Sequence, residues 1–207
     1  MVVGGGTRPK IGVLALQGDV AEHMAMLSRA GARPVAVKHA EQLNEIDGLI
    51  IPGGESTTMG KLLRRFEMLE PLQNRARTGF PIYGTCAGMI LLADEVLDPG
   101  TDQPGIGGMN IAVRRNAFGR QRESFEADVS VKDIGDEPLH AVFIRAPLIS
   151  RLGSNVEELA NINGRSVAAR QGNLLVTSFH PELTDDDRMH RYFLSLVEAG
   201  RGAAAAR

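Results

Sequence analysis

The sequence predicts an α/β fold in which a mainly parallel central sheet lies between helices on both faces. In the first half of the chain, short apolar runs alternate with amphipathic stretches, a pattern typical of β-α-β units. From about Gly105 onward, short strands follow one another without long helices between them, which predicts antiparallel strands added to the same sheet. The expected architecture is a three-layer sandwich.

The first half contains four apolar runs that predict strands. Helical spacing of apolar residues predicts a helix over residues 21–30, and Ser56 is the expected N-cap of a second helix over 57–66. Pro71 suits the first turn of the next helix. The predicted strands are residues 11–16, 35–37, 48–51 and 81–83.

The second half is expected to supply short strands and one closing helix. Asn163-Gly164 and Gly172-Asn173 have the composition of hairpin turns. An amphipathic helix is predicted over residues 185–199, and residues 1–9 and 200–207 are expected to be loose termini. The predicted strands are residues 111–113, 125–131, 141–144, 167–169 and 174–178.

Composition limits the class of protein. With 207 residues, 43% of them hydrophobic, the chain is expected to form a single domain spanning residues 1–207. A formal net charge of -2 gives no support for nucleic acid or an anionic membrane as partner. One cysteine cannot form an internal disulfide, and we find neither a signal peptide nor a membrane span, so a cytoplasmic location is expected.

The single cysteine, Cys86, has the setting of a nucleophile elbow. It lies in Gly84-Thr85-Cys86-Ala87-Gly88, after a predicted strand and before the helix-like residues 89–93. Glycines two residues to either side remove the Cβ atoms that would obstruct a sharp strand-to-helix turn. The helix N-terminus favours a thiolate there, so Cys86 is the candidate nucleophile.

His180-Pro181-Glu182 is the candidate partner of this nucleophile. A cysteine nucleophile needs a base to accept and return a proton, and often a third group that orients the base. Positions two apart in extended backbone project to the same side, so Glu182 is placed to hold the imidazole of His180. None of the other four histidines has a carboxylate so placed beside a strand end.

A glycine pair offers a candidate oxyanion site. Gly53 and Gly54 begin a strand-to-helix turn expected at the same sheet edge as Cys86. Their N–H groups, with that of Ala87, could stabilise an oxyanion. A phosphate-binding loop fails on spacing, because Glu55 replaces the required glycine and Leu62 the required hydroxyl residue.

Arginines cluster after residue 113, and Arg145 ends another predicted strand. One of them could hold a substrate carboxylate, although the spacing does not select which. A metal site has no support, since the sequence lacks a His-Glu-x-x-His motif, a second cysteine and clustered histidines. No cofactor is expected.

Together these motifs resemble the class I (triad) glutamine amidotransferases, and within them the glutaminase subunits of pyridoxal 5'-phosphate synthase. The resemblance runs from about residue 11 to 199. The triad motifs indicate only the superfamily, whereas the Glu-Ser-Thr-Thr turn and the block 115–121 are specific to the subfamily. The matching segments are residues 12–18, 52–59, 84–88, 115–121, 143–147 and 178–183.

The resemblance implies a flavodoxin-like amidotransferase fold and a reaction. Cys86 would attack the side-chain amide of L-glutamine, His180 would protonate the departing ammonia, and water would hydrolyse the thioester. A separate synthase (lyase) subunit in a large hetero-oligomer would receive the ammonia, with Gln17 near that partner. The implied substrate-binding residues are Gly54, Glu55, Ser56, Arg115, Ile144 and Arg145.

Two alternatives stay open at this point. The same chemistry could serve a different biosynthetic synthase, such as one for histidine or purines. A sensor or chaperone with an elbow cysteine is a second alternative, and it would have no need of His180-Pro181-Glu182.

Overall fold

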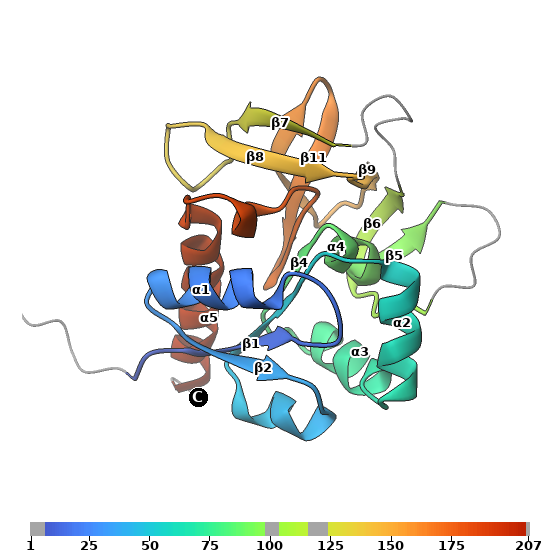
Figure 1. Cartoon of the computed structure of the whole chain (residues 1–207), viewed down its shortest axis with the longest axis vertical. Coiled ribbons are helices and arrows are strands. Elements are labelled where there is room, and N and C mark those ends of the chain that lie inside the picture. Colours follow the sequence, from blue (N-terminus) through green and yellow to red (C-terminus); the bar gives the residue numbers. More distant parts are fainter. Residues whose placement is uncertain (1–6, 98–103, 116–123, 206–207) are drawn as a thin grey trace, which may run out of the picture.

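The computed structural model describes residues 7–97, 104–115 and 124–205. A ten-stranded mixed sheet forms its centre (Figure 1), and the strands that pair along it run in the order β2-β1-β3-β4-β12-β11-β9-β6-β5. The tenth strand, β10, pairs with β11. The predicted α/β class is therefore confirmed.

The parallel half of the sheet places the candidate residues at one edge. Its five strands are mutually parallel, so their carboxyl ends lie at the same edge. The loops that follow β1, β3, β4 and β12 therefore meet there. The strands are β1 (Lys10–Leu14), β2 (Arg33–Val37), β3 (Gly48–Ile51), β4 (Ile82–Thr85) and β12 (Leu174–Thr177).

The other half is mostly antiparallel, as predicted. Asn163 and Gly164, with φ of 52° and 77°, make the turn between β10 and β11, and Gly172 helps to turn β11 into β12. β5 is the exception, since it runs parallel to β6. These strands are β5 (Ala93–Val96), β6 (Met109–Arg114), β9 (Leu148–Leu152), β10 (Glu157–Ile162) and β11 (Arg165–Gln171).

Two predicted strands do not join the main sheet. β7 (Ser124–Val129) and β8 (Leu139–Ile144) pair only with each other, as a two-stranded antiparallel sheet. β7 alternates between exposed and partly buried positions, whereas strands inside a covered sheet are buried on both faces. The ribbon nevertheless contributes to the site, because the carbonyl of Val142 on β8 accepts the backbone N–H of His180 at 2.9 Å.

Helices cover both faces of the sheet and enclose two apolar cores. Leu27 of α1 and Phe193 of α5 pack on one side, whereas Met59 of α2, Leu72 of α3 and Met89 of α4 pack on the other. Figure 1 shows α1 and α5 together, apart from α2 and α3. The helices are α1 (Val20–Arg29), α2 (Ser56–Arg65), α3 (Leu69–Arg77), α4 (Ala87–Leu92) and α5 (Arg188–Ala205), with 3-10 helices η1 (Ala40–Glu45) and η2 (Pro181–Leu183).

Several boundaries differ from the predicted ones. α5 begins at Arg188 and continues to Ala205, so part of the expected loose carboxyl terminus is helical. The strands β5, β9 and β10 were not predicted, since charged residues interrupt their apolar pattern. Among the described residues, no helix combines the length and the apolar character that a membrane span requires.

Candidate active site

Cys86 occupies a strained turn between β4 and α4. Its φ of 48° and ψ of -101° are unusual for a residue with a side chain, and its backbone N–H donates to the carbonyl of Thr177 on β12 at 2.8 Å. A Cβ on Gly84 would lie 2.5 Å from the backbone of Gly88, and one on Gly88 would lie 2.3 Å from the carbonyl oxygen of Ile51. The predicted sharp strand-to-helix turn at Cys86 and its need for both glycines are confirmed, and the role of Cys86 as nucleophile stays a prediction.

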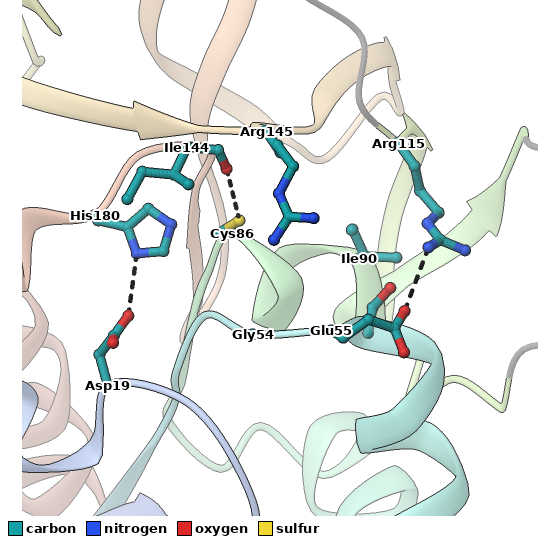
Figure 2. A pocket seen from close by; sticks show the side chains of 10 residues that line it. Asp19, Gly54, Glu55, Cys86, Ile90, Arg115, Ile144, Arg145 and His180 are labelled. Carbon is teal, nitrogen blue, oxygen red and sulfur yellow. Dashed lines mark hydrogen bonds and ion pairs between the residues drawn. The ribbon is translucent and has the colours of Figure 1, made fainter. Parts of the chain in front are cut away.

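His180 and Glu182 form a buried pair beside this turn. The Nδ1 atom of His180 lies 2.7 Å from Oε1 of Glu182, and the two residues are only 4% and 5% exposed. In Figure 2 the imidazole of His180 turns its other nitrogen toward Cys86. This nitrogen, Nε2, is buried and makes no hydrogen bond of normal geometry with the described residues. The structure therefore brings together the three residues predicted as a triad.

The charges of the site favour a protonated His180. Burial by itself would lower the pKa of His180, but the neighbouring Cys86 sulfur and the Glu182 carboxylate outweigh it and raise the pKa to about 10. Burial raises the pKa of Glu182, and its hydrogen bond to His180 works against that rise. An imidazolium next to sulfur stabilises a thiolate, the reactive form of cysteine.

The sulfur faces a small pocket at the carboxyl edge of the parallel strands (Figure 2). The cavity has a volume of about 250 Å³, which suits a ligand of amino-acid size better than a nucleotide. Every residue predicted to bind substrate contributes to its wall. The lining residues are Asp19, Gly54, Glu55, Ser56, Cys86, Ile90, Arg115, Ile144, Arg145 and His180.

The three residues predicted to form the oxyanion site differ in their position relative to the pocket. Gly54, with φ of 145°, lines the pocket, whereas Gly53 and Ala87 are not among its described lining residues. A Cβ on Gly53 would lie 2.4 Å from Cε1 of His180, so Gly53 packs directly against the imidazole. The side chain of Gln17 lies beside Gly54, because a Cβ on Gly54 would be 3.6 Å from Gln17 Oε1.

Glu55 replaces Ser56 as the N-cap of α2, which corrects the prediction. The Glu55 carboxylate accepts the backbone N–H groups of Thr57 and Thr58 at 2.9 and 2.7 Å, while Ser56 is already helical and buried. Burial raises the pKa of Glu55, but the hydrogen bonds from Thr58 and Thr57 dominate and lower it to about 2. Glu55 thus fixes the start of the helix at the pocket wall.

Two arginines reach the pocket from separate sheets, one after β6 of the main sheet and one after β8 of the two-stranded sheet. Arg115, at the end of β6, lies 3.4 Å from Glu55 Oε1 and donates to Thr57 Oγ1 at 3.2 Å. Arg145 follows β8 with a strained φ of 43° and has no ion-pair partner within the described residues. Most of the predicted arginine-containing block, residues 116–121, lies outside the part of the chain that the structure describes.

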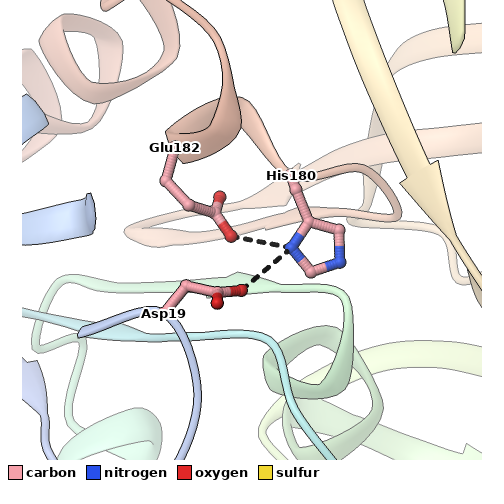
Figure 3. A group of neighbouring side chains, drawn as sticks. All are labelled: Asp19, His180 and Glu182. Carbon is pink, nitrogen blue, oxygen red and sulfur yellow. Dashed lines mark hydrogen bonds and ion pairs between the residues drawn. The ribbon is translucent and has the colours of Figure 1, made fainter. Parts of the chain in front are cut away.

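Asp19 is a pocket residue that sequence reasoning missed. It precedes α1 without capping it, and its Oδ2 lies 3.6 Å from His180 Nδ1 (Figure 3). Its position after β1, at the same sheet edge as the other motifs, was the available signal. Ile90 of α4 was missed as well.

Asp19, His180 and Glu182 are close enough for their ligand atoms to hold a cation. A metal at Nδ1 of His180 would displace the proton shared with Glu182 at 2.7 Å. That would remove the orientation of the imidazole that cysteine chemistry needs. The hydrogen bond between Glu182 and His180 is sufficient to explain the short distance between the two side chains.

Comparison with known proteins decides the family. The model of the SNO glutamine amidotransferase family matches residues 13–199. The chain belongs to this family. Proteins of Frankia casuarinae and Streptomyces avermitilis, each named pyridoxal 5'-phosphate synthase subunit PdxT, are both 58% identical to this member, over 92% and 93% of the chain and 96% of their own length.

Solved structures agree with this SNO family assignment. A crystal structure described as a glutamine amidotransferase superposes with a TM-score of 0.86 at 48% identity, covering 91% of this chain and 98% of the other. A putative GMP synthase subunit from Thermoplasma acidophilum has a TM-score of 0.70 at 18% identity over 97% of this chain and 100% of its own. The second likeness shows a shared fold alone.

Proposed function

We propose that this chain is the glutaminase subunit of a pyridoxal 5'-phosphate synthase. It hydrolyses L-glutamine to L-glutamate and ammonia, and it supplies the ammonia to a separate synthase subunit. The observation that carries the proposal is the buried His180–Glu182 hydrogen bond of 2.7 Å beside the strained Cys86 turn, in a pocket of amino-acid size. Residues 1–207 would act as one glutaminase domain.

Acylation begins with attack of the Cys86 thiolate on the side-chain amide carbon of glutamine. The oxygen of the tetrahedral intermediate takes the negative charge, and the N–H groups of Gly54 and Ala87 are our candidates for stabilising it. His180 gives its proton to the amide nitrogen, the C–N bond breaks, and ammonia leaves. A γ-glutamyl thioester remains on Cys86, and His180 is neutral.

Deacylation uses the same residues in the reverse direction. Neutral His180 accepts a proton from water as the oxygen attacks the thioester carbon. The C–S bond then breaks, which returns the thiolate and the imidazolium, and the glutamic acid product loses its proton to solvent. Glu182 holds Nδ1 of His180 throughout, so that Nε2 stays directed at the reacting atoms.

Substrate recognition follows from the charges of the pocket wall. We assign the binding of the α-carboxylate of glutamine to the guanidinium of Arg145, since Arg115 already contacts Glu55. Gly54, Ser56 and Ile144 complete the wall around the side chain of the substrate. Glu55 contributes indirectly, because its carboxylate caps α2.

The identity of the acceptor rests on the relatives. Those more than 50% identical are named as subunits of pyridoxal 5'-phosphate synthase, whereas the GMP synthase likeness is only 18% identical. This favours the pyridoxal phosphate enzyme over another synthase. Gln17, exposed beside Gly54, is our candidate for a contact that couples the partner to the oxyanion turn. A cytoplasmic location suits a catalytic thiol that must stay reduced.

Glutamate release, measured with and without the synthase subunit, tests this function. We expect release by the wild-type chain, stimulation by the partner, and loss of activity in Cys86→Ala with glutamine binding retained. The related His180→Asn variant should lose nearly as much. Undiminished hydrolysis by Cys86→Ala would exclude the proposed nucleophile, and equal rates with and without the partner would exclude coupling.

A further inference from the structure

Two buried histidines outside the triad lie behind Glu182. His23 on α1 and His190 on α5 are both fully buried, and His23 Nδ1 lies 3.0 Å from His190 Nε2. The other nitrogen of His23, Nε2, lies 3.2 Å from Thr85 Oγ1 and 3.4 Å from Glu182 Oε2. His23 is therefore placed between the strand end that carries Cys86 and the carboxylate that holds His180.

One arrangement of protons among these groups supplies Glu182 with a hydrogen-bond donor. Burial, together with the neighbouring His190 and His180, lowers the pKa of His23 well below 6.5, so that its imidazole is neutral and has one N–H. If His190 donates from Nε2 to Nδ1 of His23, the N–H of His23 is at Nε2 and points to Thr85 and Glu182. Oε2 of Glu182 has no hydrogen bond of normal geometry with the described residues, so this N–H faces an acceptor that needs it.

We propose that His23, held in this tautomer by His190, is a positioning residue that fixes the Glu182 carboxylate and through it the imidazole of His180. The chain of contacts runs from α5 through α1 to η2 and the elbow, so that two helices packed on one face of the sheet set the geometry of the nucleophile. This role rests on the proposed glutaminase chemistry.

The charged surroundings determine the direction of the expected effect. Without the His23 N–H, a buried Glu182 carboxylate is less stabilised, so it holds the imidazolium of His180 less well. A weaker imidazolium favours the Cys86 thiolate less, and a higher pH is then needed to form it. The titratable and charged groups facing this chain of contacts are Asp19, Tyr83, Cys86, Arg145, His180, Glu182, Asp187 and His190.

Alkylation by iodoacetamide measures this effect directly, because Cys86 is the only cysteine in the chain. The rate is recorded against pH for the full-length wild type, His23→Met and His23→Gln. We expect His23→Met to move the midpoint of the pH profile upward by about one pH unit, which slows alkylation by about tenfold at pH values well below both midpoints. His23→Gln can donate a hydrogen bond from a similar position and should recover part of the shift.

A matched control separates positioning from general loss of stability. Leu27→Val removes a buried methylene from the same helix without touching these contacts, and it should leave the pH midpoint in place. If His23→Met does not fold, it is replaced in the comparison by His23→Gln and by His190→Gln, which weakens the contact between His190 and His23. Each of these variants should give a smaller upward shift of the pH midpoint.

An unchanged midpoint in folded His23→Met, or in His190→Gln together with His23→Gln, would overturn the positioning role. Equal shifts in Leu27→Val and the histidine variants would overturn it too. Glutamate release by wild type and Cys86→Ala distinguishes this failure from failure of the proposed function. If Cys86→Ala is inactive while the histidine variants match wild type, only the role of His23 is lost.

Discussion

Gly53→Ala tests the placement of the imidazole with a single added methyl group. The new Cβ would lie 2.4 Å from Cε1 and 3.1 Å from Nδ1 of His180. Carbon atoms in contact prefer about 3.5 Å or more, so the buried ring must move by about 1 Å. A displacement of about 1 Å in a catalytic group costs on the order of 10²-fold in rate. We expect kcat for glutamate release to fall by about that factor.

The assay compares glutamate release in the presence of the synthase subunit with the thermal midpoint of unfolding. Gly105→Ala is the matched control, because a Cβ there would have its nearest neighbour at 3.6 Å, an ordinary contact. It should keep full activity. Wild-type kcat in Gly53→Ala would refute the packing of Gly53 against His180 and with it the space that we assign to the imidazole.

Three further predictions concern binding, helix capping and acid stability. Arg145→Gln should raise the KM for glutamine by about tenfold or more, with a smaller change in kcat, because a charge-assisted contact to a carboxylate is worth about 1.5–3 kcal/mol. Steady-state kinetics measures both constants, and an unchanged KM would exclude Arg145 from the binding site. Glu55→Ala should lower the free energy of unfolding by about 1 kcal/mol in urea titrations, the usual cost of losing an N-cap, and no loss would contradict its capping role. Burial lowers the pKa of His190 from 6.5 to about 4, so the unfolded chain binds a proton more readily between these values. The free energy of unfolding should therefore fall by about 3 kcal/mol as pH drops through this range. Urea titrations at several pH values should show a weaker pH dependence of this free energy in His190→Gln. An identical pH dependence in the variant would count against a neutral, buried His190.

The parallel strands, the Cys86 turn and the His180–Glu182 pair could be predicted because each is determined by local sequence. The strand over Gly48–Ile51 is a continuous apolar run that ends at proline and glycine, and the structure has the same bounds. The elbow around Cys86 depends on the absence of Cβ atoms, a property that is visible in Gly84 and Gly88. The residues that determine each of these features lie within a few positions of one another in the sequence.

The remaining features depend on contacts between distant segments. Nothing near β7 and β8 indicates that they pair apart from the main sheet, because this depends on which surfaces the other strands leave uncovered. Glu55 replaces Ser56 as N-cap because a longer carboxylate reaches two backbone N–H groups. His23 and His190 are 167 residues apart, and only the packing of α1 against α5 brings them together.

The most direct measurement is rapid quenching of the enzyme during turnover of glutamine, in the presence of the synthase subunit, followed by mass spectrometry of the peptide that contains Cys86. We predict a γ-glutamyl thioester on Cys86 that accumulates in Glu182→Gln, where the imidazole is held less firmly for deacylation. Turnover of glutamine in wild type and variant with no adduct on Cys86, or with the adduct on another residue, would contradict the central claim.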